Sequence, residues 1–376
     1  MCQISQRLLC VNDFLQTDFA TLRTRTGLLH QFRPAPPRKN TDGEPASLPW
    51  SFTSHAFFLY AANPAGAPPA YFARRRFPMP KHFITIRDLG DDAMKLVLRA
   101  AEMKKSNFRC DCLQGKILVL LFEKASTRTR LSFETAVRRL GGQTVFMTPQ
   151  ESQLGRSEPL KDTARVISRY NDGMIVRTFG QSKLEQLMEY GSIPVVNALT
   201  DEGHPCQIMS DMLTMYERRP DIPALHIAWI GDGNNMANSF IEAAMVFGFT
   251  LSLACPEGYD PDQALLTQAR EAGAKIYLHR DPAAAVEGAH FVHTDVWASM
   301  GQEEEQNARL TAFKGFRVDD RLMQLAAPGA KFMHCLPAHR GEEVTEDVLE
   351  GPASIVFDQA ENRLHMQMAI LEWIYS

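Results

Sequence analysis

The chain has 376 residues, of which 45% are hydrophobic, and its 40 basic and 44 acidic residues leave a formal net charge of −4. A chain of this size and apolar content can bury a large core, and chains this long commonly divide into two domains. The balanced charge argues against a general nucleic-acid or membrane-surface binder, and no stretch reads as a membrane span.

The first 78 residues differ from the rest of the chain. Prolines recur between Pro34 and Pro78 with little helical or strand periodicity, which argues against a packed domain. Three interpretations compete: a disordered leader, an arginine-rich targeting peptide, or a stretch that is not translated because the true start is Met79. We favour a start at Met79, because the organised part of the chain begins abruptly there. The predicted fold therefore concerns residues 79–376.

From Met79 onward, short apolar runs alternate with amphipathic stretches. The run Lys116–Phe122, with the sequence KILVLLF, is typical of a buried strand. In this first block, strands are predicted at 116–122, 144–147, 173–176 and 194–197, and helices at 128–140, 160–170, 183–190 and 205–217.

A break at Arg219–Pro223 precedes a second block. Its predicted strands are 225–230, 250–254, 275–278, 291–294 and 331–334, and its predicted helices are 236–247, 262–272 and 358–374. This alternation predicts an α/β fold of two doubly wound parallel-sheet domains, with the active site in the cleft between them. We expect one domain at 79–219, completed by the closing helix at about 358–376, and the other at 220–357.

A candidate anion site follows the first strand. The string Ser126-Thr127-Arg128-Thr129-Arg130 opens a predicted helix, where unpaired N–H groups and a partial positive charge favour an anion. Three hydroxyl groups and the planar guanidinium of Arg128 suit a phosphate. A plain serine cap with solvent-facing arginines is the alternative. The whole string at a strand-to-helix junction favours phosphate binding.

Further candidates occupy matching places after neighbouring strands. Arg177 directly follows the apolar run 174–176, and His204 and Gln207 follow the next strand. These last two residues are three apart, so they lie on one side of the first helical turn. Each alone could be a surface or capping residue, but ligands in parallel sheets bind at the carboxyl ends of strands. We therefore include all three in the candidate site.

Three strings resemble the aspartate/ornithine carbamoyltransferase family. They are F-E-K-A-S-T-R-T-R at Phe122–Arg130, H-P-C-Q at His204–Gln207 and H-C-L-P at His334–Pro337, and they stand in the family's order. The resemblance covers the chain from about Met79 to its C-terminus. It implies carbamoyl phosphate as the donor of a carbamoyl group, with no metal or organic cofactor.

The same resemblance implies roles for individual residues. Ser126, Thr127, Arg128 and Thr129 would hold the phosphate, Arg177, His204 and Gln207 the carbamoyl group, and Arg363, Cys335 and Leu336 would be further donor ligands. Catalysis would fall to Arg128, His204 and Cys335, with Cys335 helping to position and deprotonate the attacking amine. Gln153 looks like the glutamine that reaches a neighbouring subunit's site, which implies a homotrimer with shared active sites.

The acceptor is suggested by the segment Asp295–Gly301, with the sequence DVWASMG. It resembles the ornithine branch of the family, and an aspartate there offers an anion to a cationic amino acid. The resemblance implies that Asn235, Asp295, Ser299 and Met300 bind L-ornithine. The expected reaction converts carbamoyl phosphate and L-ornithine into L-citrulline and phosphate, commonly a step of arginine biosynthesis. The alternatives are a related carbamoyltransferase that acts on putrescine or a modified ornithine, a non-catalytic homologue, and a hydrolase with a Cys335–histidine nucleophile.

Other motifs favour no additional chemistry. The seven cysteines are scattered and odd in number, which predicts a reducing, cytoplasmic location. Cys110 and Cys112 lack a second ligand pair, so a zinc site is not expected. Gly231–Met236 has a methionine where a dinucleotide-binding loop has its third glycine, so a nicotinamide cofactor is not expected either.

Overall fold

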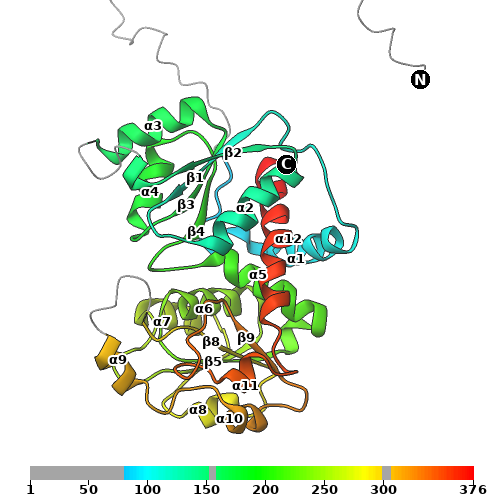
Figure 1. The fold of residues 1–376 in the computed structure, drawn as a ribbon, viewed down its shortest axis with the longest axis vertical. Helices are drawn as coiled ribbons and strands as arrows, with labels where there is room; N and C mark the ends of the chain where they lie inside the picture. Colours follow the sequence, from blue (N-terminus) through cyan, green and yellow to red (C-terminus); the bar gives the residue numbers. More distant parts are fainter. Residues whose placement is uncertain (1–79, 152–157, 299–305) are drawn as a thin grey trace, which may run out of the picture. The chain divides into compact units, whose positions relative to one another are not determined.

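A computed structural model describes residues 80–151, 158–298 and 306–376 (Figure 1). The predictions for residues 1–78, for Gln153, and for Ser299 and Met300 concern positions outside these ranges. Among the residues that are described, none of the helices combines the length and the apolar run that a membrane crossing would need.

The first sheet is parallel, with strand order β2-β1-β3-β4. Its strands are β1 (Ile117–Phe122), β2 (Gln143–Met147), β3 (Gly173–Arg177) and β4 (Val195–Leu199). Side chains of β1 alternate between two buried faces: Leu118 and Leu120 join one apolar cluster, whereas Val119 and Leu121 join another. A strand buried on both faces explains why its sequence is an unbroken apolar run.

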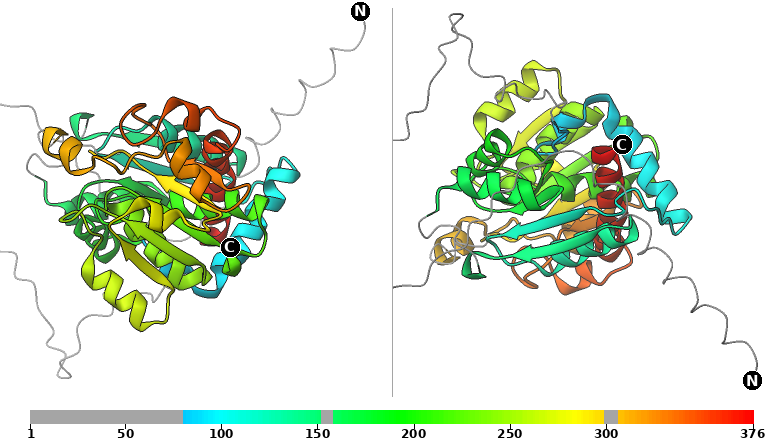
Figure 2. Two further views of the ribbon diagram at one scale, coloured as in Figure 1. Left: turned by 90° about the horizontal axis from the view of Figure 1, so that it is seen from below. Right: turned by 90° about the horizontal axis from the view of Figure 1, so that it is seen from above.

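Helices cover both faces of this sheet. On one face lie α1 (Ala93–Lys105), α2 (Thr127–Arg139), α5 (Pro205–Arg218) and α12 (Val356–Tyr375), and on the other lie α3 (Leu160–Tyr170) and α4 (Ser182–Tyr190). The last helix of the chain therefore packs with helices of the first block. Both views of Figure 2 show α12 beside α1, although more than 250 residues separate them in the sequence.

The second sheet is also parallel, with strand order β7-β6-β5-β8-β9. Its strands are β5 (His226–Ile230), β6 (Thr250–Ala254), β7 (Ile276–His279), β8 (Phe291–Thr294) and β9 (Lys331–His334). Helices α6 (Asn235–Phe247) and α7 (Gln263–Glu271) cover one face, and α8 (Pro282–Val286), α10 (Asp320–Leu325) and α11 (Glu346–Leu349) cover the other. Helix α9 (Gln306–Ala312) precedes α10.

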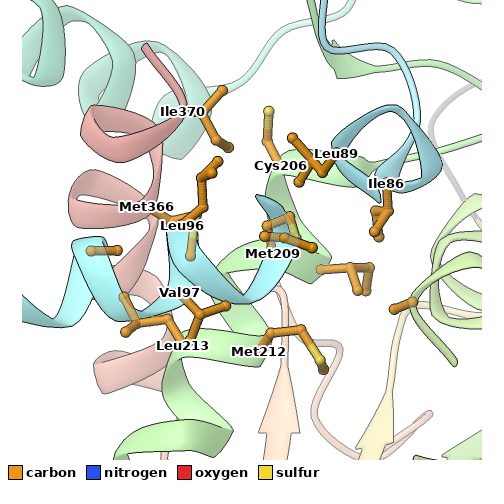
Figure 3. Packing of buried hydrophobic residues seen from close by; sticks show 14 of the residues in the cluster. Ile86, Leu89, Leu96, Val97, Cys206, Met209, Met212, Leu213, Met366 and Ile370 are labelled. Atoms are coloured by element: carbon orange, nitrogen blue, oxygen red, sulfur yellow. The ribbon is translucent and has the colours of Figure 1, made fainter. Parts of the chain in front are cut away.

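One apolar cluster runs through both sheets. Figure 3 shows its central part, where side chains from η2 (Ile86–Asp92), α1, α5 and α12 point into a common interior. Met209 and Met212 of α5 meet Leu96 and Val97 of α1 in this cluster. Burying such side chains stabilises the fold by roughly 1.5–3 kcal/mol each. The two sheets thus share one core.

The predicted fold class is confirmed. Every predicted strand and helix is present, with ends that differ by at most two residues. Helix α1 was not predicted, although its buried residues Leu96, Val97, Ala100 and Ala101 have helical spacing. The other missed helices, α8 to α11, contain between four and seven residues, too few turns for a clear period.

Candidate active site

The residues predicted to bind the carbamoyl donor, here called the donor-side candidates, lie together because three neighbouring strands end at the same level. Among the described residues they are Ser126, Thr127, Arg128, Thr129, Arg177, His204, Gln207, Cys335, Leu336 and Arg363. Phe122 of β1 is in register with Arg177 of β3, and Arg177 is in register with Leu199 of β4. The loops that follow β1 and β4 carry Ser126 and His204. The carboxyl edge of the first sheet therefore gathers the three segments, as parallel topology requires.

Ser126 is the N-cap of α2. Its backbone is extended, with φ −161° and ψ 118°, and its Oγ accepts a hydrogen bond from the Thr129 N–H at 3.2 Å. The alternative of a plain serine cap thus describes Ser126 itself. It does not describe Arg128, which is half-buried and donates from Nη2 to the Leu336 carbonyl oxygen at 2.5 Å. Arg128 therefore joins the start of α2 to the segment that follows β9.

Arg363 of α12 binds two donor-side candidates at once. Its Nη1 donates to Gln207 Oε1 at 2.9 Å, and its Nη2 donates to Thr129 Oγ1 at 2.9 Å. All three residues are buried. The start of α2 and the start of α5 are therefore fixed to each other by a guanidinium that comes from the C-terminal helix.

Arginines on the donor side lie close enough to repel one another. Burial and the neighbouring Arg363 lower the pKa of Arg177 to about 10, and burial lowers the pKa of Arg363 as well. Arg128 adds a further repulsive charge to both groups. Arg177 and Arg363 stay charged at neutral pH, so a bound anion would relieve their repulsion. The electrostatics of the site suit a phosphate.

His204 lies at the N-cap of α5, with its backbone N–H donating to Ser239 Oγ at 2.8 Å. Burial, followed by the charges of Arg363 and Arg177, holds its pKa well below the ordinary value of 6.5. The imidazole is therefore neutral at neutral pH. Its buried Nδ1 has no hydrogen-bond partner among the described residues, so the ring retains an unused polar atom.

The acceptor-side candidates gather in the same way at the second sheet. Ile230 of β5, Thr294 of β8 and His334 of β9 are in register, and Asn235, Asp295 and Cys335 follow those strands. The Asn235 side-chain amide reaches across to the first block, donating to the Thr200 carbonyl oxygen at 2.7 Å. Together with the contact between Arg128 and Leu336, it joins the carboxyl edges of both sheets.

Asp295 and Cys335 form a hydrogen-bonded pair. The Cys335 thiol donates to Asp295 Oδ1 at 3.0 Å, and the Asn234 amide donates to Asp295 Oδ2 at 3.4 Å. Burial of the sulfur and the adjacent Asp295 carboxylate raise the pKa of Cys335 well above its ordinary range. Cys335 is therefore a protonated thiol at neutral pH and not a thiolate nucleophile or base.

The histidines near Cys335 in the sequence do not activate it. His334 Nδ1 accepts from the Leu336 N–H at 2.9 Å, so its Nε2 carries the hydrogen and faces Glu343 Oε1 at 3.2 Å. His339 lies exposed beside Glu342. Asp295, His334 and Cys335 place potential metal ligands within 4.8 Å of one another, but both ring nitrogens of His334 already have partners. This geometry favours neither a cysteine–histidine dyad nor a metal at this point.

A buried polar network behind the site was not predicted. Asp211 Oδ1 accepts from Gln207 Nε2 at 2.9 Å and from Gln359 Nε2 at 2.8 Å. Gln359 Oε1 in turn accepts from the His334 N–H at 2.9 Å, and His293 Nε2 lies 3.2 Å from Asp211 Oδ2. Asp211 stands four residues after Gln207, one helical turn on, which is the sequence signal that could have indicated it.

The glycine-rich loop after β5 serves packing. Asp232 forms a buried ion pair with Arg309, with 2.7 Å between Oδ2 and Nη1. A Cβ at Gly233 would lie 2.1 Å from the backbone nitrogen of Pro261, so only glycine fits there. The close approach of the chain at Pro261 explains this glycine without a dinucleotide.

A cavity of about 790 Å³ lies beside the start of α5, where Gly203 and Pro205, the chain neighbours of His204, line it. Arg87, Glu202, Glu242 and Asp262 are among its lining residues, and none of the described site candidates lines it. Arg87 Nε pairs with Glu242 Oε1 at 3.1 Å. Four of its five charged lining residues are acidic, which does not suit a phosphate-bearing substrate, so the chemistry is assigned to the paired sheet edges.

Two domain families match the chain. Residues 81–217 match the aspartate/ornithine carbamoyltransferase carbamoyl-P binding domain, and residues 224–374 match the Asp/Orn binding domain of the same family. An ornithine carbamoyltransferase of Nitratidesulfovibrio vulgaris is 70% identical over 299 residues, which cover 79% of this chain and 100% of the relative. One from Oleidesulfovibrio alaskensis is 71% identical over 297 residues, which cover 79% and 99%.

Solved structures agree with these matches. The ornithine carbamoyltransferase of Thermus thermophilus is similar with a TM-score of 0.73 and 40% identity, covering 79% of this chain and 99% of that one. The enzyme of Pyrococcus furiosus gives a TM-score of 0.74 and 42% identity over 78% and 96%. The chain belongs to the aspartate/ornithine carbamoyltransferase family.

Proposed function

We propose that this chain transfers the carbamoyl group of carbamoyl phosphate to the side-chain amine of L-ornithine, giving L-citrulline and phosphate. The observation that carries the proposal is the meeting of two opposite charges at the paired sheet edges. Arg128, Arg177 and Arg363 supply positive charge on one side, and Asp295 supplies a carboxylate on the other. A phosphorylated donor and a cationic acceptor complement these charges. The matched domain families and the names of the similar enzymes support the same reaction.

On the donor side, the phosphate lies at the start of α2. Ser126, Thr127, Arg128 and Thr129 bind its oxygens through N–H, hydroxyl and guanidinium groups. Arg177 and His204 address the carbonyl oxygen, and Gln207, held between Arg363 and Asp211, addresses the amide end. Arg363, Cys335 and Leu336 complete the donor pocket, and Gln153 of a neighbouring subunit closes it.

On the acceptor side, Asp295 binds an ammonium group of L-ornithine. The carboxylate already accepts hydrogen bonds from Cys335 and Asn234, so its orientation is fixed before the substrate arrives. Asn235 follows Asn234 at the start of α6 and is a further ornithine ligand, as are Ser299 and Met300. Because Cys335 stays protonated, it positions the attacking amine as a hydrogen-bonding thiol, and the amine enters in its neutral form or loses its proton to solvent or phosphate.

The reaction itself is one displacement at the carbonyl carbon. The neutral amine adds to this carbon, and negative charge develops on the carbonyl oxygen, where Arg128, Arg177 and neutral His204 stabilise it. The bond from carbon to the phosphate oxygen then breaks, and phosphate leaves with the bonding electrons and can accept the proton lost by nitrogen. Holding both reactants in line can contribute roughly 7–11 kcal/mol. No cofactor is required by this balance of atoms and charge.

The proposal extends to the domains, the oligomeric state, the pathway and the cellular compartment. The first sheet with α12 forms the donor-binding domain, and the second sheet forms the ornithine-binding domain. The enzyme works as a homotrimer with shared sites, in arginine biosynthesis in the cytoplasm. The free thiols of the five described cysteines support a reducing compartment. Light scattering tests the trimer, which should have about three times the chain mass of 42.2 kDa.

The activity is tested by incubating the purified full chain with carbamoyl phosphate and L-ornithine and measuring citrulline and phosphate. We expect equal amounts of both products and no comparable carbamoylation of putrescine, which lacks the carboxylate of ornithine. The proposed acceptor fails if putrescine is carbamoylated at least as fast as L-ornithine, and the reaction fails if neither amine is carbamoylated.

A substitution separates the two half-sites. Asp295→Asn keeps the size of the side chain but removes the charge, so the KM for L-ornithine should rise by at least tenfold, since a desolvated charged hydrogen bond contributes about 1.5–3 kcal/mol. The KM for carbamoyl phosphate should change far less. An equal rise in both constants would contradict the role given to Asp295.

A further inference from the structure

The loop between α1 and β1 brings two thiols into contact. Cys110 Sγ lies 2.7 Å from Cys112 Sγ, and the Cys112 backbone N–H donates to Cys110 Sγ at 3.3 Å. A covalent disulfide has a sulfur–sulfur distance of about 2.05 Å. The two side chains therefore point at each other and need only a small movement to bond.

The backbone holds this arrangement from both sides. The Cys110 N–H donates to the Arg139 carbonyl oxygen at 3.3 Å, and the Leu113 N–H donates to that of Leu140 at 2.8 Å. Within the loop, the Gln114 N–H donates to the Asp111 carbonyl oxygen at 2.9 Å. A fixed loop gives the two thiols a high effective concentration toward each other, so ring closure competes well against reaction with a second external molecule.

The pair of thiols is also accessible to small molecules in solvent, and its surroundings do not favour metal binding. Cys112 is exposed and Cys110 is half-buried, whereas Cys206 and Cys255 are buried. Among the described residues, neither thiol belongs to a cluster of three potential metal ligands. Two sulfur atoms without a third ligand favour redox chemistry over a structural zinc.

We propose that Cys110 and Cys112 form a redox-active dithiol that low-molecular-weight disulfides, such as oxidised glutathione, convert into an intramolecular disulfide. One thiolate attacks the external disulfide, forms a mixed disulfide and releases one external thiolate. The second cysteine then attacks the mixed disulfide, forms the Cys110–Cys112 bond and releases the other external thiolate. Two protein thiols are oxidised to one disulfide, and one external disulfide is reduced to two thiols. The two protons that the cysteines lose are taken up by the two external thiolates.

Two features set the conditions for this exchange. Burial of the Cys112 sulfur and the adjacent Cys110 sulfur raise the pKa of Cys112 to about 12, so the exchange should be faster at alkaline pH. The dithiol lies beside Arg139 at the end of α2, whereas Ser126 caps its beginning. Thirteen helical residues span about 20 Å, so oxidation is separate from the active site.

A peptide map tests the proposal without any activity assay. The full chain is treated with oxidised glutathione at pH 8.5, its remaining thiols are alkylated under denaturing conditions, and it is cut with trypsin. Cleavage after Arg109 and Lys116 releases the peptide Cys110–Lys116, which contains these two cysteines and no other. We expect this peptide to be unalkylated and lighter than the dithiol peptide by two hydrogen atoms.

The matched control is Cys112→Ser, which cannot close the ring and should carry glutathione or an alkyl group on Cys110. In the unsubstituted chain, a peptide that carries two alkyl groups, or a stable glutathione adduct, would overturn the proposal. Because the readout is the mass of one peptide, its failure is independent of whether the chain makes citrulline.

Discussion

At the scale of single residues, burial decides which groups of the site carry charge. His204 is neutral because burial and two arginines oppose its protonation, and Cys335 is a thiol because burial and Asp295 oppose its ionisation. The arginines stay charged despite burial. The site therefore presents fixed positive charge to the donor and neutral hydrogen-bonding groups to the reacting atoms, which favours stabilising a developing oxyanion.

The protonated thiol leads to a prediction about pH. If Cys335 positions the amine without ionising, Cys335→Ser should retain a hydrogen-bonding hydroxyl and lower kcat/KM for L-ornithine by less than Cys335→Leu does. The pH profile of kcat/KM should keep its shape in Cys335→Ser, because no thiolate contributes to it. Steady-state kinetics between pH 6 and 9.5 check both points. A carbamoyl adduct on Cys335, detected by mass spectrometry during turnover, would contradict this role.

A second prediction concerns Asp211, which is not a proposed substrate ligand but accepts a hydrogen bond from Gln207, which is one. Asp211→Leu removes the acceptor of two buried amides, so kcat/KM for carbamoyl phosphate should fall by about tenfold or more. Asp211→Asn keeps an oxygen toward both amides and should lose less than about threefold. Ser210→Ala serves as the control, because Ser210 is a buried neighbour whose hydroxyl donates to the Cys206 carbonyl oxygen. Equal losses in the leucine and asparagine variants would show that Asp211 does not act by positioning.

Several candidates that sequence could predict lie at the end of a strand or directly after it. Arg177, Asp295 and Cys335 could be located because parallel topology places strand ends together. Gln359 could not, because its role depends on which buried side chains meet across helices distant in sequence. The strained backbone of Leu336, with φ 58°, likewise could not be predicted from the amino-acid sequence.

At the scale of elements, α12 connects the two halves of the site. Arg363 fixes α2 to α5, and Gln359, one turn earlier, ties Asp211 of α5 to the end of β9. The sequence pattern predicted this helix, and the family resemblance predicted Arg363. It gave no sign that the glutamine one turn away would complete the link, because a buried polar residue on a helix has no periodic pattern of its own.

This linking role predicts different effects for two buried amides of α12. Gln359→Leu leaves the His334 N–H unpaired next to Cys335, so the KM values of both substrates should rise severalfold and stability should fall by about 1–3 kcal/mol. Asn362→Leu breaks bonds to Thr214 and Glu217 and should lower stability by a similar amount. Its KM values should stay near those of the parent. If Asn362→Leu changes the KM values as much as Gln359→Leu, α12 acts on the site only through stability.

At the scale of the whole molecule, the buried neutral His204 makes the free energy of unfolding depend on pH. The pKa of His204 is lowered in the folded state, so the unfolded chain binds the proton more readily. Its contribution is complete above the ordinary value of 6.5 and is lost as pH falls toward the folded-state pKa. The free energy of unfolding, measured with urea, should therefore decrease from pH 7 to pH 5.5.

The comparison that isolates this effect is His204→Gln, which cannot titrate. Its free energy of unfolding should change less between pH 7 and pH 5.5 than that of the parent chain. His82, His226, His290 and His365 also have lowered pKa values, so part of the slope should remain. Identical slopes in the two proteins would contradict a neutral, buried His204.

The most direct measurement is a crystal structure with a bisubstrate analogue that joins a phosphonate to L-ornithine through an amide. We predict that the phosphonate lies at the start of α2, in contact with Arg128, and that the α-ammonium of the ornithine part lies within hydrogen-bonding distance of Asp295. An analogue bound elsewhere, or one whose phosphonate contacts only the second sheet, would contradict the assignment of donor and acceptor to the two sheet edges.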